Sequence, residues 1–236
     1  MKTITNEKLI YNRRRIGQVA TFVSLGILGI GLYMSFKPEL MSYSFAALIV
    51  GFLLSQLGIY YGGRWGRSPR PDEVISQALK GLDNKYTLYH YISAVNHLLV
   101  GPAGIWILMP FHQGGTITYD KSKGRWKQKG GNMYLKIFAQ ESLGRPDMDA
   151  KTQSSAIQKF IDNKLPEIDL VKPQTILIFS NEKAEISISD SPIPTLTVDK
   201  LKDFIRRTAK QDPVPSEMTQ PLIDVLPTES IEQRNK

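Results

Sequence analysis

Two long apolar stretches occupy the first third of the chain. Residues 16–36 and 43–63 are runs of 21 residues each, and neither contains a formal charge. At 1.5 Å per residue, each run would form a helix about 30 Å long, which matches the hydrocarbon core of a bilayer. Only residues 37–42 separate the runs, and Pro38 in this segment ends a helix. The pattern predicts two antiparallel transmembrane helices joined by a tight turn.

Basic residues flank the outer ends of these stretches. Arginines 13–15 precede the first, Arg64, Arg67 and Arg70 follow the second, and the connecting segment has a single lysine. Because cytoplasmic flanks carry the excess of Lys and Arg, we expect a two-span protein whose N-terminus and main domain are cytoplasmic. Residues 1–15 would be a basic N-terminal segment and 64–71 a juxtamembrane linker. The alternative for the first stretch is a cleaved signal peptide, but its apolar run exceeds the usual length of about 7 to 15 residues.

Small residues recur every four positions in the second stretch, at Ala47, Gly51 and Ser55. This spacing predicts a face on which the first helix packs closely. The alternative is simple composition, since small residues are frequent in membrane helices.

The chain after residue 71 alternates between helical and strand patterns. Asp72 and Glu73 open a short helical pattern, with acids where the helix dipole favours them. Strand patterns follow at 86–93, 95–100 and 105–109, a hairpin is expected at 116–119 and 125–129, and two further strands at 174–180 and 185–188. Helical spacing returns at 133–143, 149–165 and 198–210. We expect residues 72–210 to form one α/β domain with a mixed sheet flanked by helices.

The last segment, residues 211–236, is polar and is interrupted by four prolines, at 213, 215, 221 and 227. Such a composition has no visible way to bury a core, so the tail is predicted to be disordered.

The net charge of +8 comes almost entirely from the N-terminal region. Residues 1–71 hold nine basic and two acidic side chains, whereas the remaining residues hold 21 basic and 20 acidic ones. The excess positive charge therefore does not lie on the main domain, and it does not indicate a large nucleic-acid-binding face there. The chain has no cysteine, which excludes disulfides, thiolate zinc sites and thiol nucleophiles.

The segment NHLLVGPAGIWI at residues 96–107 resembles the core of the nuclease-related domain, NERD. That family is placed in the PD-(D/E)XK restriction-endonuclease-like superfamily. The resemblance extends over about residues 71–207, and the Gly-Pro-x-Gly turn at 101–104 is its sharpest part. It implies a restriction-endonuclease-like mixed sheet and a relationship to Mg²⁺-dependent phosphodiester cleavage.

Proteins of this kind hold the metal with an Asp that opens the second core strand and a Glu-x-Lys at the end of the third. The resemblance places Asn96, Met109 and Phe111 at these three positions. Asn brings no charge, Met sulfur is a poor magnesium ligand, and Phe cannot move a proton. Glu73 on the opening helix remains, and Gln153 loosely matches a helix Gln of the superfamily. The resemblance thus implies a domain without its catalytic residues, which we expect to bind no metal or other cofactor.

Two other metal arrangements are open. Glu73, His97 and another acid would rebuild a Mg²⁺ site in a membrane-tethered nuclease. His97 would alternatively join His90 and His112, the only other histidines, in a three-histidine site, although ordinary structural histidines explain them as well. The nearest acids are Asp120, Glu141 and Asp147, which sit by turn or helix-start signals and are expected to be caps.

One local run of cations stands out in the main domain: Lys121, Lys123, Arg125, Lys127 and Lys129. On a strand these odd-numbered residues share a face, with Trp126 on the other. The favoured interpretation is a solvated hairpin around a buried Trp126. The alternative is a site for phosphate groups or anionic lipid, with an affinity that falls as salt rises.

Three functions are compatible with these patterns. The first is a membrane-anchored, catalytically inactive NERD-like domain that binds or scaffolds a nucleic acid or a protein. The second is the nuclease with a relocated Mg²⁺ site. The third is a structural membrane protein that docks a partner through residues 221–227.

Overall fold

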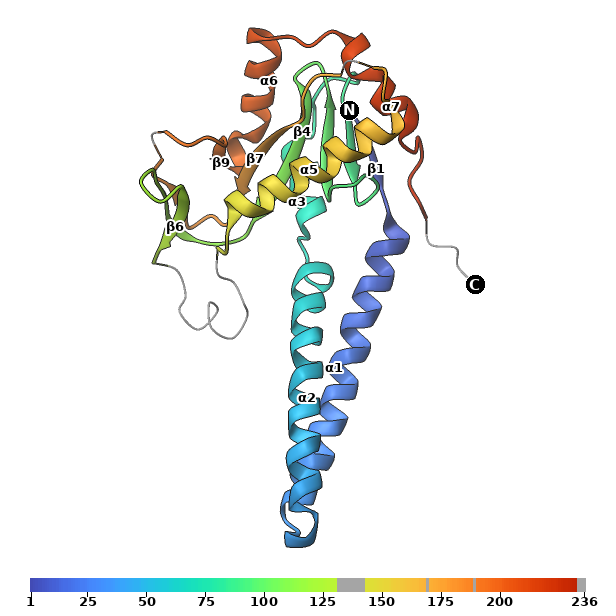
Figure 1. Cartoon of the computed structure of the whole chain (residues 1–236), viewed down its shortest axis with the longest axis vertical. Coiled ribbons are helices and arrows are strands. Elements are labelled where there is room, and N and C mark those ends of the chain that lie inside the picture. Colours follow the sequence, from blue (N-terminus) through green and yellow to red (C-terminus); the bar gives the residue numbers. More distant parts are fainter. Residues whose placement is uncertain (131–142, 169, 189, 233–236) are drawn as a thin grey trace. The chain divides into compact units, whose positions relative to one another are not determined.

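The computed structural model describes residues 1–130, 143–168, 170–188 and 190–232. The helix expected at 133–143 and the acid Glu141 lie outside these residues, apart from Leu143. The chain forms two compact units, drawn in Figure 1. One is a helical hairpin, Glu7–Arg70, and the other combines Met1–Asn6 with Pro71–Glu232.

The hairpin consists of α1 (Glu7–Ser35) and α2 (Met41–Tyr61), joined through a short 3₁₀ turn, η1 (Pro38–Leu40). A π-helical turn, η2 (Gly62–Gly66), continues α2. Both apolar stretches are therefore helical, and both helices are long and apolar enough to cross a membrane. The first helix begins earlier than the apolar run, so arginines 13–15 lie within α1 rather than in a separate segment.

Small residues line the contact between α1 and α2 at intervals of seven. Gly17, Ser24 and Gly31 are the buried small residues of α1, and Ser44, Gly51 and Gly58 are those of α2. The Ser44 hydroxyl donates a hydrogen bond of 2.7 Å to the Gly31 carbonyl across the interface. Seven residues complete two helical turns, which keeps one seam facing the partner. The four-residue stripe is thus correct only in part, because Gly51 is buried in this contact whereas Ser55 is only partly buried.

We expect Gly58→Leu to open the hairpin, because a Cβ at this position would collide with the Thr21 hydroxyl and lie 3.2 Å from the Thr21 Cα. Overpacking of this kind costs about 1–3 kcal/mol. Spin labels on Val19→Cys and Leu57→Cys, both at exposed positions of a cysteine-free chain, should report a longer and broader distance distribution. Gly26→Leu is the control, since no atom lies within 4 Å of its added Cβ. An unchanged distance in Gly58→Leu would contradict this packing.

The second unit is built on a six-stranded sheet of order β1-β2-β3-β4-β7-β9. The strands are β1 (Lys2–Thr5), β2 (Thr87–His90), β3 (His97–Gly101), β4 (Gly104–Phe111), β7 (Gln174–Phe179) and β9 (Thr195–Thr197). β2, β3 and β4 form an antiparallel meander, whereas β1 pairs with β2, β7 with β4 and β9 with β7 in parallel. The expected mixed-sheet α/β class is therefore confirmed.

Helices cover both faces of this sheet. Ile75 and Leu79, from α3 (Pro71–Ala78) and the turn that follows it, share one buried cluster with Leu201 and Ile205 of α6 (Leu201–Gln211). A short 3₁₀ turn, η3 (Val198–Lys200), precedes α6. On the other face, α5 (Pro146–Lys164) crosses the sheet in Figure 1 and buries Ile157 and Ile161 in a second cluster. Alternate residues of β3 and β4 belong to one cluster or the other, as the pleat of a strand requires.

A smaller three-stranded sheet has the order β6-β5-β8. β5 (Gly115–Asp120) and β6 (Arg125–Lys129) form the expected antiparallel hairpin, whose turn contains Gly124 at a φ of +59°. β8 (Ala184–Ile186) pairs in parallel with β5 and lies at the edge of this sheet, close to the strand expected at 185–188.

The N-terminus is part of the main domain, which the sequence analysis did not anticipate. β1 pairs residue by residue with β2, and Ile4 is 1% exposed. The interpretation of residues 1–15 as a basic flanking segment is therefore wrong. A strand of four residues with one apolar side chain is too short to give a periodic signal, and its partner lies more than 80 positions further along the chain.

The tail is also ordered, against expectation. It forms a 3₁₀ turn, η4 (Ser216–Met218), and a helix, α7 (Gln220–Val225), and Ile231 bridges to Asn6. Leu222 and Leu226 are buried in the cluster beneath α5. Pro221 stands in the first turn of α7, where a missing N–H costs nothing, so this proline begins a helix rather than breaking one. The domain therefore extends through Glu232 rather than ending at residue 210.

Candidate functional site

The motif positions suggested by the resemblance lie at one end of β3 and β4. β3 and β4 pair with Leu98 opposite Ile107. Continuing this register by two residues sets Asn96, just before β3, opposite Met109. Phe111 follows two residues later at the end of β4, where the strand still pairs with Phe179 of β7. The structure thus brings these three positions to one end of the sheet, and Met109 and Phe111 share the face that α5 covers.

This end of the sheet is filled with apolar side chains. Met109 is 4% exposed and belongs to the buried cluster beneath α5. The Phe111 ring packs on the Phe179 ring with a centroid distance of 5.4 Å and an interplanar angle of 20°. Gln153 of α5 has a buried Oε1 with no hydrogen-bond partner among the described residues. None of the three motif positions, Asn96, Met109 and Phe111, supplies a carboxylate.

Glu73 is on the opposite side of the sheet. It is a half-buried residue of α3, and the apolar residues that anchor this segment, Ile75 and Leu79, lie in the cluster shared with α6. Met109 and Phe111 pack on the α5 side instead. The structure therefore does not bring the retained Glu73 together with the other three motif positions.

A buried pair formed by two of the three histidines that the sequence analysis considered for a metal site lies on the α3 side. His90 and His97 are 1% and 2% exposed, and their Nδ1 atoms are 2.8 Å apart. The Ser76 hydroxyl lies 2.8 Å from the other ring nitrogen of His90. Two Nδ1 atoms at this distance share one proton, so the pair is stable with at most one positive charge. The pairing follows from the β2–β3 register, which sets His90 opposite His97 and is not visible in a linear sequence.

The other candidate metal ligands are dispersed. His112 is exposed and contacts the Ser180 hydroxyl at 3.2 Å, apart from the buried pair. Asp120 accepts hydrogen bonds from the backbone N–H groups of Ser122 and Lys123, which is the expected capping role. Asp147, in the first turn of α5, pairs with Arg145 at 2.7 Å. Within the described parts of the chain, no group of three or more His, Asp or Glu side chains is arranged to hold a metal ion.

The β5–β6 hairpin separates its cations from its aromatic residues, as the alternation predicts. Trp126 is 5% exposed, its Nε1 donates a hydrogen bond of 3.1 Å to the Thr195 hydroxyl, and its ring centroid is 4.6 Å from that of Tyr119. Arg125, Lys127 and Lys129 alternate with the inward residues of β6. Lys121 and Lys123 lie in the turn rather than on the strand, so only three of the five cations lie on the predicted face of the strand.

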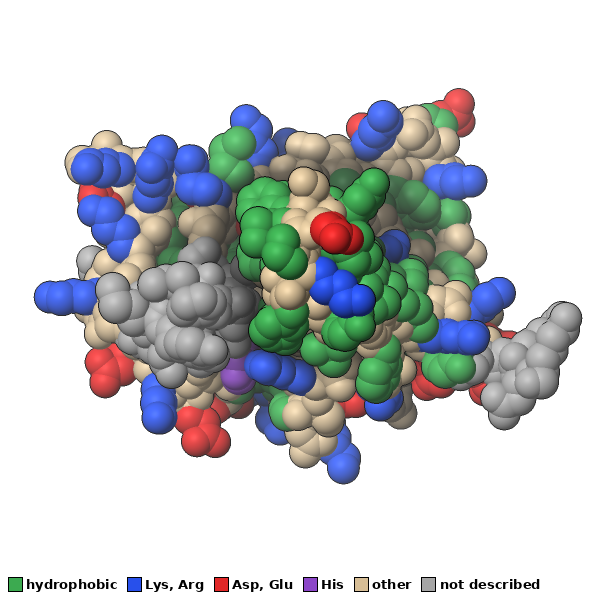
Figure 2. Space-filling model, turned by 90° about the horizontal axis from the view of Figure 1, so that it is seen from below, with side chains coloured by type: hydrophobic (Ala, Val, Ile, Leu, Met, Phe, Trp, Pro, Cys, Tyr) green, Lys and Arg blue, Asp and Glu red, His purple; other side chains and the backbone are tan. Residues whose placement is uncertain are grey.

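Two of these five cations are paired. Lys127 contacts Asp120 at 2.7 Å, and Lys121 forms an ion pair with Asp190. Lys123, Arg125 and Lys129 have no ion pair with any residue that the structure describes. Lys and Arg side chains gather at the left edge of the face in Figure 2, on the side where Figure 1 places β6. We call the five cations of this hairpin, residues 121, 123, 125, 127 and 129, the basic ribbon.

The hydrogen bond from Lys127, followed by that from Ser122, holds the pKa of Asp120 well below its usual range. A carboxyl whose pKa is lowered on folding stabilises the hairpin above its ordinary pKa, and this contribution is lost as the pH falls. We expect Lys127→Ala to move the pKa of Asp120 upward, toward that of a free aspartate. NMR titration of the Asp120 carboxyl carbon would measure the change, with Lys159→Ala as the control. An unchanged pKa in Lys127→Ala would show that Lys127 is not its main cause.

Comparison with known proteins gives no match: no family model, no curated protein and no solved structure is similar enough to the chain to assign it to a family.

Proposed function

We propose that this protein is a membrane-anchored, non-catalytic domain of the nuclease-related type that binds nucleic acid through its basic ribbon. The order of elements in the second unit supports the relationship. α3, the β2–β4 meander, the β5–β6 hairpin, α5, β7 and α6 follow in the order of the pattern that accompanied the resemblance. The proposal has three parts, which are the membrane anchor, the absence of metal-dependent catalysis and the nucleic-acid ligand.

The anchor is supported by the exposed surface of the hairpin. Large apolar side chains point outward from both helices, such as Phe22 at 74% and Phe45 at 68% exposure. A core helix of a soluble protein buries such residues, whereas a membrane helix presents them to lipid. β1 precedes α1 and β2 follows α2, yet the two strands pair in one sheet. This pairing supports an anchor that crosses the bilayer twice, and the flanking arginines favour the cytoplasmic side for both of its ends.

The main support for the absence of catalysis is the burial of Met109 together with the stacking of Phe111 on Phe179. These are the positions at which the resemblance implies a metal-binding Glu and a Lys. They contribute to the apolar core, and the remaining acid of the motif, Glu73, belongs to the other face. Mg²⁺ requires several oxygen ligands around one point, and the motif positions supply only an Asn amide there. The same reasoning disfavours a relocated nuclease site.

The basic ribbon supports a phosphate-bearing ligand. Residues 125, 127 and 129 are two apart on a strand and therefore repeat at about 6.7 Å. Three of the five cations have no carboxylate partner among the described residues. A two-stranded ribbon fits the major groove of DNA, and its cations contact phosphates without reading sequence. Docking of a protein through the tail is less well supported, because Leu222 and Leu226 are buried within the domain.

The test uses the full chain in nanodiscs of zwitterionic lipid and a fluorescent DNA duplex. We expect binding that weakens as salt rises, and the triple variant Lys123→Gln/Arg125→Gln/Lys129→Gln should flatten the slope of log K against log [salt] by up to about 3. The control Lys151→Gln/Lys159→Gln/Lys164→Gln removes the same charge from exposed positions of α5 and should bind like the wild type.

Two results would contradict the proposal. Equal losses in both triple variants would show that the ribbon is not the contact surface. Cleavage of DNA or RNA that requires Mg²⁺ or Mn²⁺ and disappears in Glu73→Gln would show that the domain is an enzyme.

A further inference from the structure

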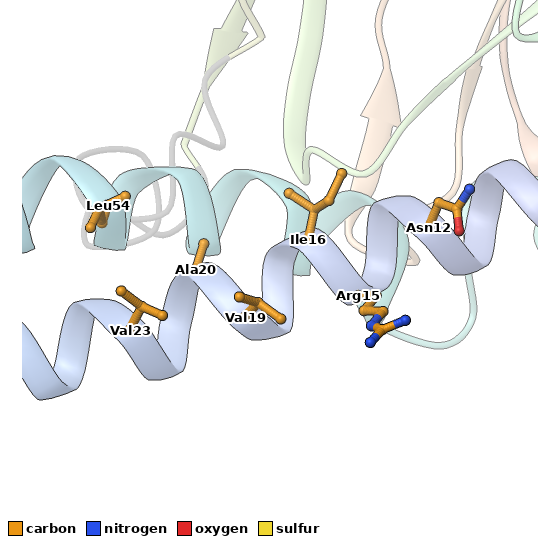
Figure 3. Close-up of a pocket in the computed structure, with 7 residues that line it drawn as sticks. All are labelled: Asn12, Arg15, Ile16, Val19, Ala20, Val23 and Leu54. Atoms are coloured by element: carbon orange, nitrogen blue, oxygen red, sulfur yellow. The ribbon is translucent and has the colours of Figure 1, made fainter.

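The hairpin carries a groove along one side of α1. It is an open groove with a volume of about 600 Å³, lined by α1 residues together with Leu54 of α2 (Figure 3): Asn12, Arg15, Ile16, Val19, Ala20, Val23 and Leu54. This volume falls within the range of about 300–1,000 Å³ that small-molecule sites occupy. All of these residues belong to the hairpin unit.

The lining is divided by polarity along the helix. Asn12 and Arg15 are at one end, and Ile16, Val19, Ala20 and Val23 follow along the same face of α1, as Figure 3 shows. Arg15 is the last charged residue before the apolar run, which places it at the level of the lipid headgroups in the anchor proposed above. From Ile16 to Val23 the helix rises by about 10 Å, which covers about two thirds of the hydrocarbon depth of one leaflet. The groove therefore has the polarity of a lipid and the length to hold the upper part of one acyl chain.

The charge at the polar end selects among lipids. Arg15 forms no ion pair with any residue the structure describes, whereas its neighbour Arg13 donates a hydrogen bond of 2.9 Å to the Tyr61 hydroxyl. No carboxylate lines the groove. A guanidinium binds phosphate in a bidentate manner, and the amide of Asn12 offers a further donor for a headgroup hydroxyl. The phosphate of an anionic lipid is attracted to Arg15. In a zwitterionic lipid the headgroup's own cation offsets this attraction.

We propose that this groove binds one anionic glycerophospholipid of the phosphatidylglycerol type. Its phosphate lies on Arg15 and Asn12, and an acyl chain lies along Ile16, Val19, Ala20 and Val23. Ala20 is half-buried and forms the floor of the groove, because its small side chain leaves room between α1 and Leu54. The inference rests on the membrane anchor of the proposed function, but not on the absence of catalysis or on nucleic-acid binding.

Native mass spectrometry of the full chain, released from nanodiscs of equimolar phosphatidylglycerol and phosphatidylcholine, tests the site. We expect one phosphatidylglycerol to remain bound to the wild type. Arg15→Gln should lower the bound fraction about fivefold, as expected for one interfacial charge, and Arg15→Lys should restore part of it. Arg14→Gln is the matched control, since it removes the same charge one position away and outside the groove lining.

A second pair of variants fills the groove without changing the charge. Ala20→Phe should lose the lipid, whereas Ala46→Phe, at an exposed position of α2, should retain it. Circular dichroism confirms that both variants keep their helices. Equal retention in Arg15→Gln and Arg14→Gln, or equal retention of the two lipids by the wild type, would overturn the proposal.

Carbonate extraction of membranes separates the two ways in which the inference can fail. A chain released by carbonate is not an integral membrane protein, in which case the anchor fails and the lipid site with it. A chain that resists extraction but shows no lipid preference retains its anchor and loses only the lipid site.

Discussion

Met109→Glu is expected to destabilise the main domain strongly rather than to create a metal site. Met109 is 4% exposed and packs among the apolar side chains of the cluster beneath α5. A buried, unpaired charge costs several kcal/mol or forces the acid to remain protonated. We expect a loss of roughly 3 kcal/mol or more from a total stability of about 5–15 kcal/mol. For a domain of this size, the melting temperature should fall by at least about 6 °C.

Thermal unfolding of the full chain in detergent, followed by circular dichroism, measures this effect. Met148→Glu is the matched control, because Met148 is 53% exposed in the first turn of α5 and the new charge favours the helix dipole. A domain that tolerated Met109→Glu together with Phe111→Lys, and then cleaved DNA with Mg²⁺, would show that the site still accommodates a metal. In that case the proposal that the packing of Phe111 on Phe179 takes the place of a metal site would be wrong.

The sequence was sufficient to predict the elements that have a long apolar pattern or that end in a glycine turn. Both membrane-type helices, the β2–β4 meander, the β5–β6 hairpin and the strand at β7 follow from runs of apolar residues and from glycines at turns. Gly104 and Gly124 show why turns are informative, since both have positive φ values that other residues rarely adopt. Short elements with distant partners were missed. β1 has four residues, and the buried side chains that hold α7 come from a proline-rich tail whose composition suggests disorder.

The candidate sites show the same division. Separation of Trp126 from the cations of β6 follows from alternation along one strand, so it was predictable. The pairing of Lys121 with Asp190 was not, because the two residues are far apart in the chain. Nor was the position of Glu73 on the face opposite Met109, because a motif gives the order of residues and not the side of the sheet that each one occupies. The histidine pair likewise depends on strand register, which a single sequence does not specify.

Ile4→Asp is expected to be the second severe substitution, although it lies at the fourth position of the chain. Ile4 is 1% exposed within the cluster that contains Tyr89, and β1 hydrogen bonds to β2 along its length. Loss of the buried side chain and introduction of a charge together should cost roughly 3 kcal/mol. Thr3→Asp is the control, because Thr3 is the exposed neighbour on the same strand. A comparable melting temperature in the two variants would contradict the structural role of β1.

This prediction also bears on how the anchor and the domain are connected. The hairpin is inserted between two paired strands, so removal of β1 would take an edge strand from the sheet. If Ile4→Asp destabilises the domain, then a protease that removed residues before the first span would have the same effect, and a cleaved signal peptide would be incompatible with the folded protein. A cytoplasmic protease-accessibility assay on intact cells should then detect a tag at the N-terminus and a tag after Glu232 on the same side of the membrane. Tags on opposite sides would indicate a single crossing and would contradict the two-span anchor that we propose.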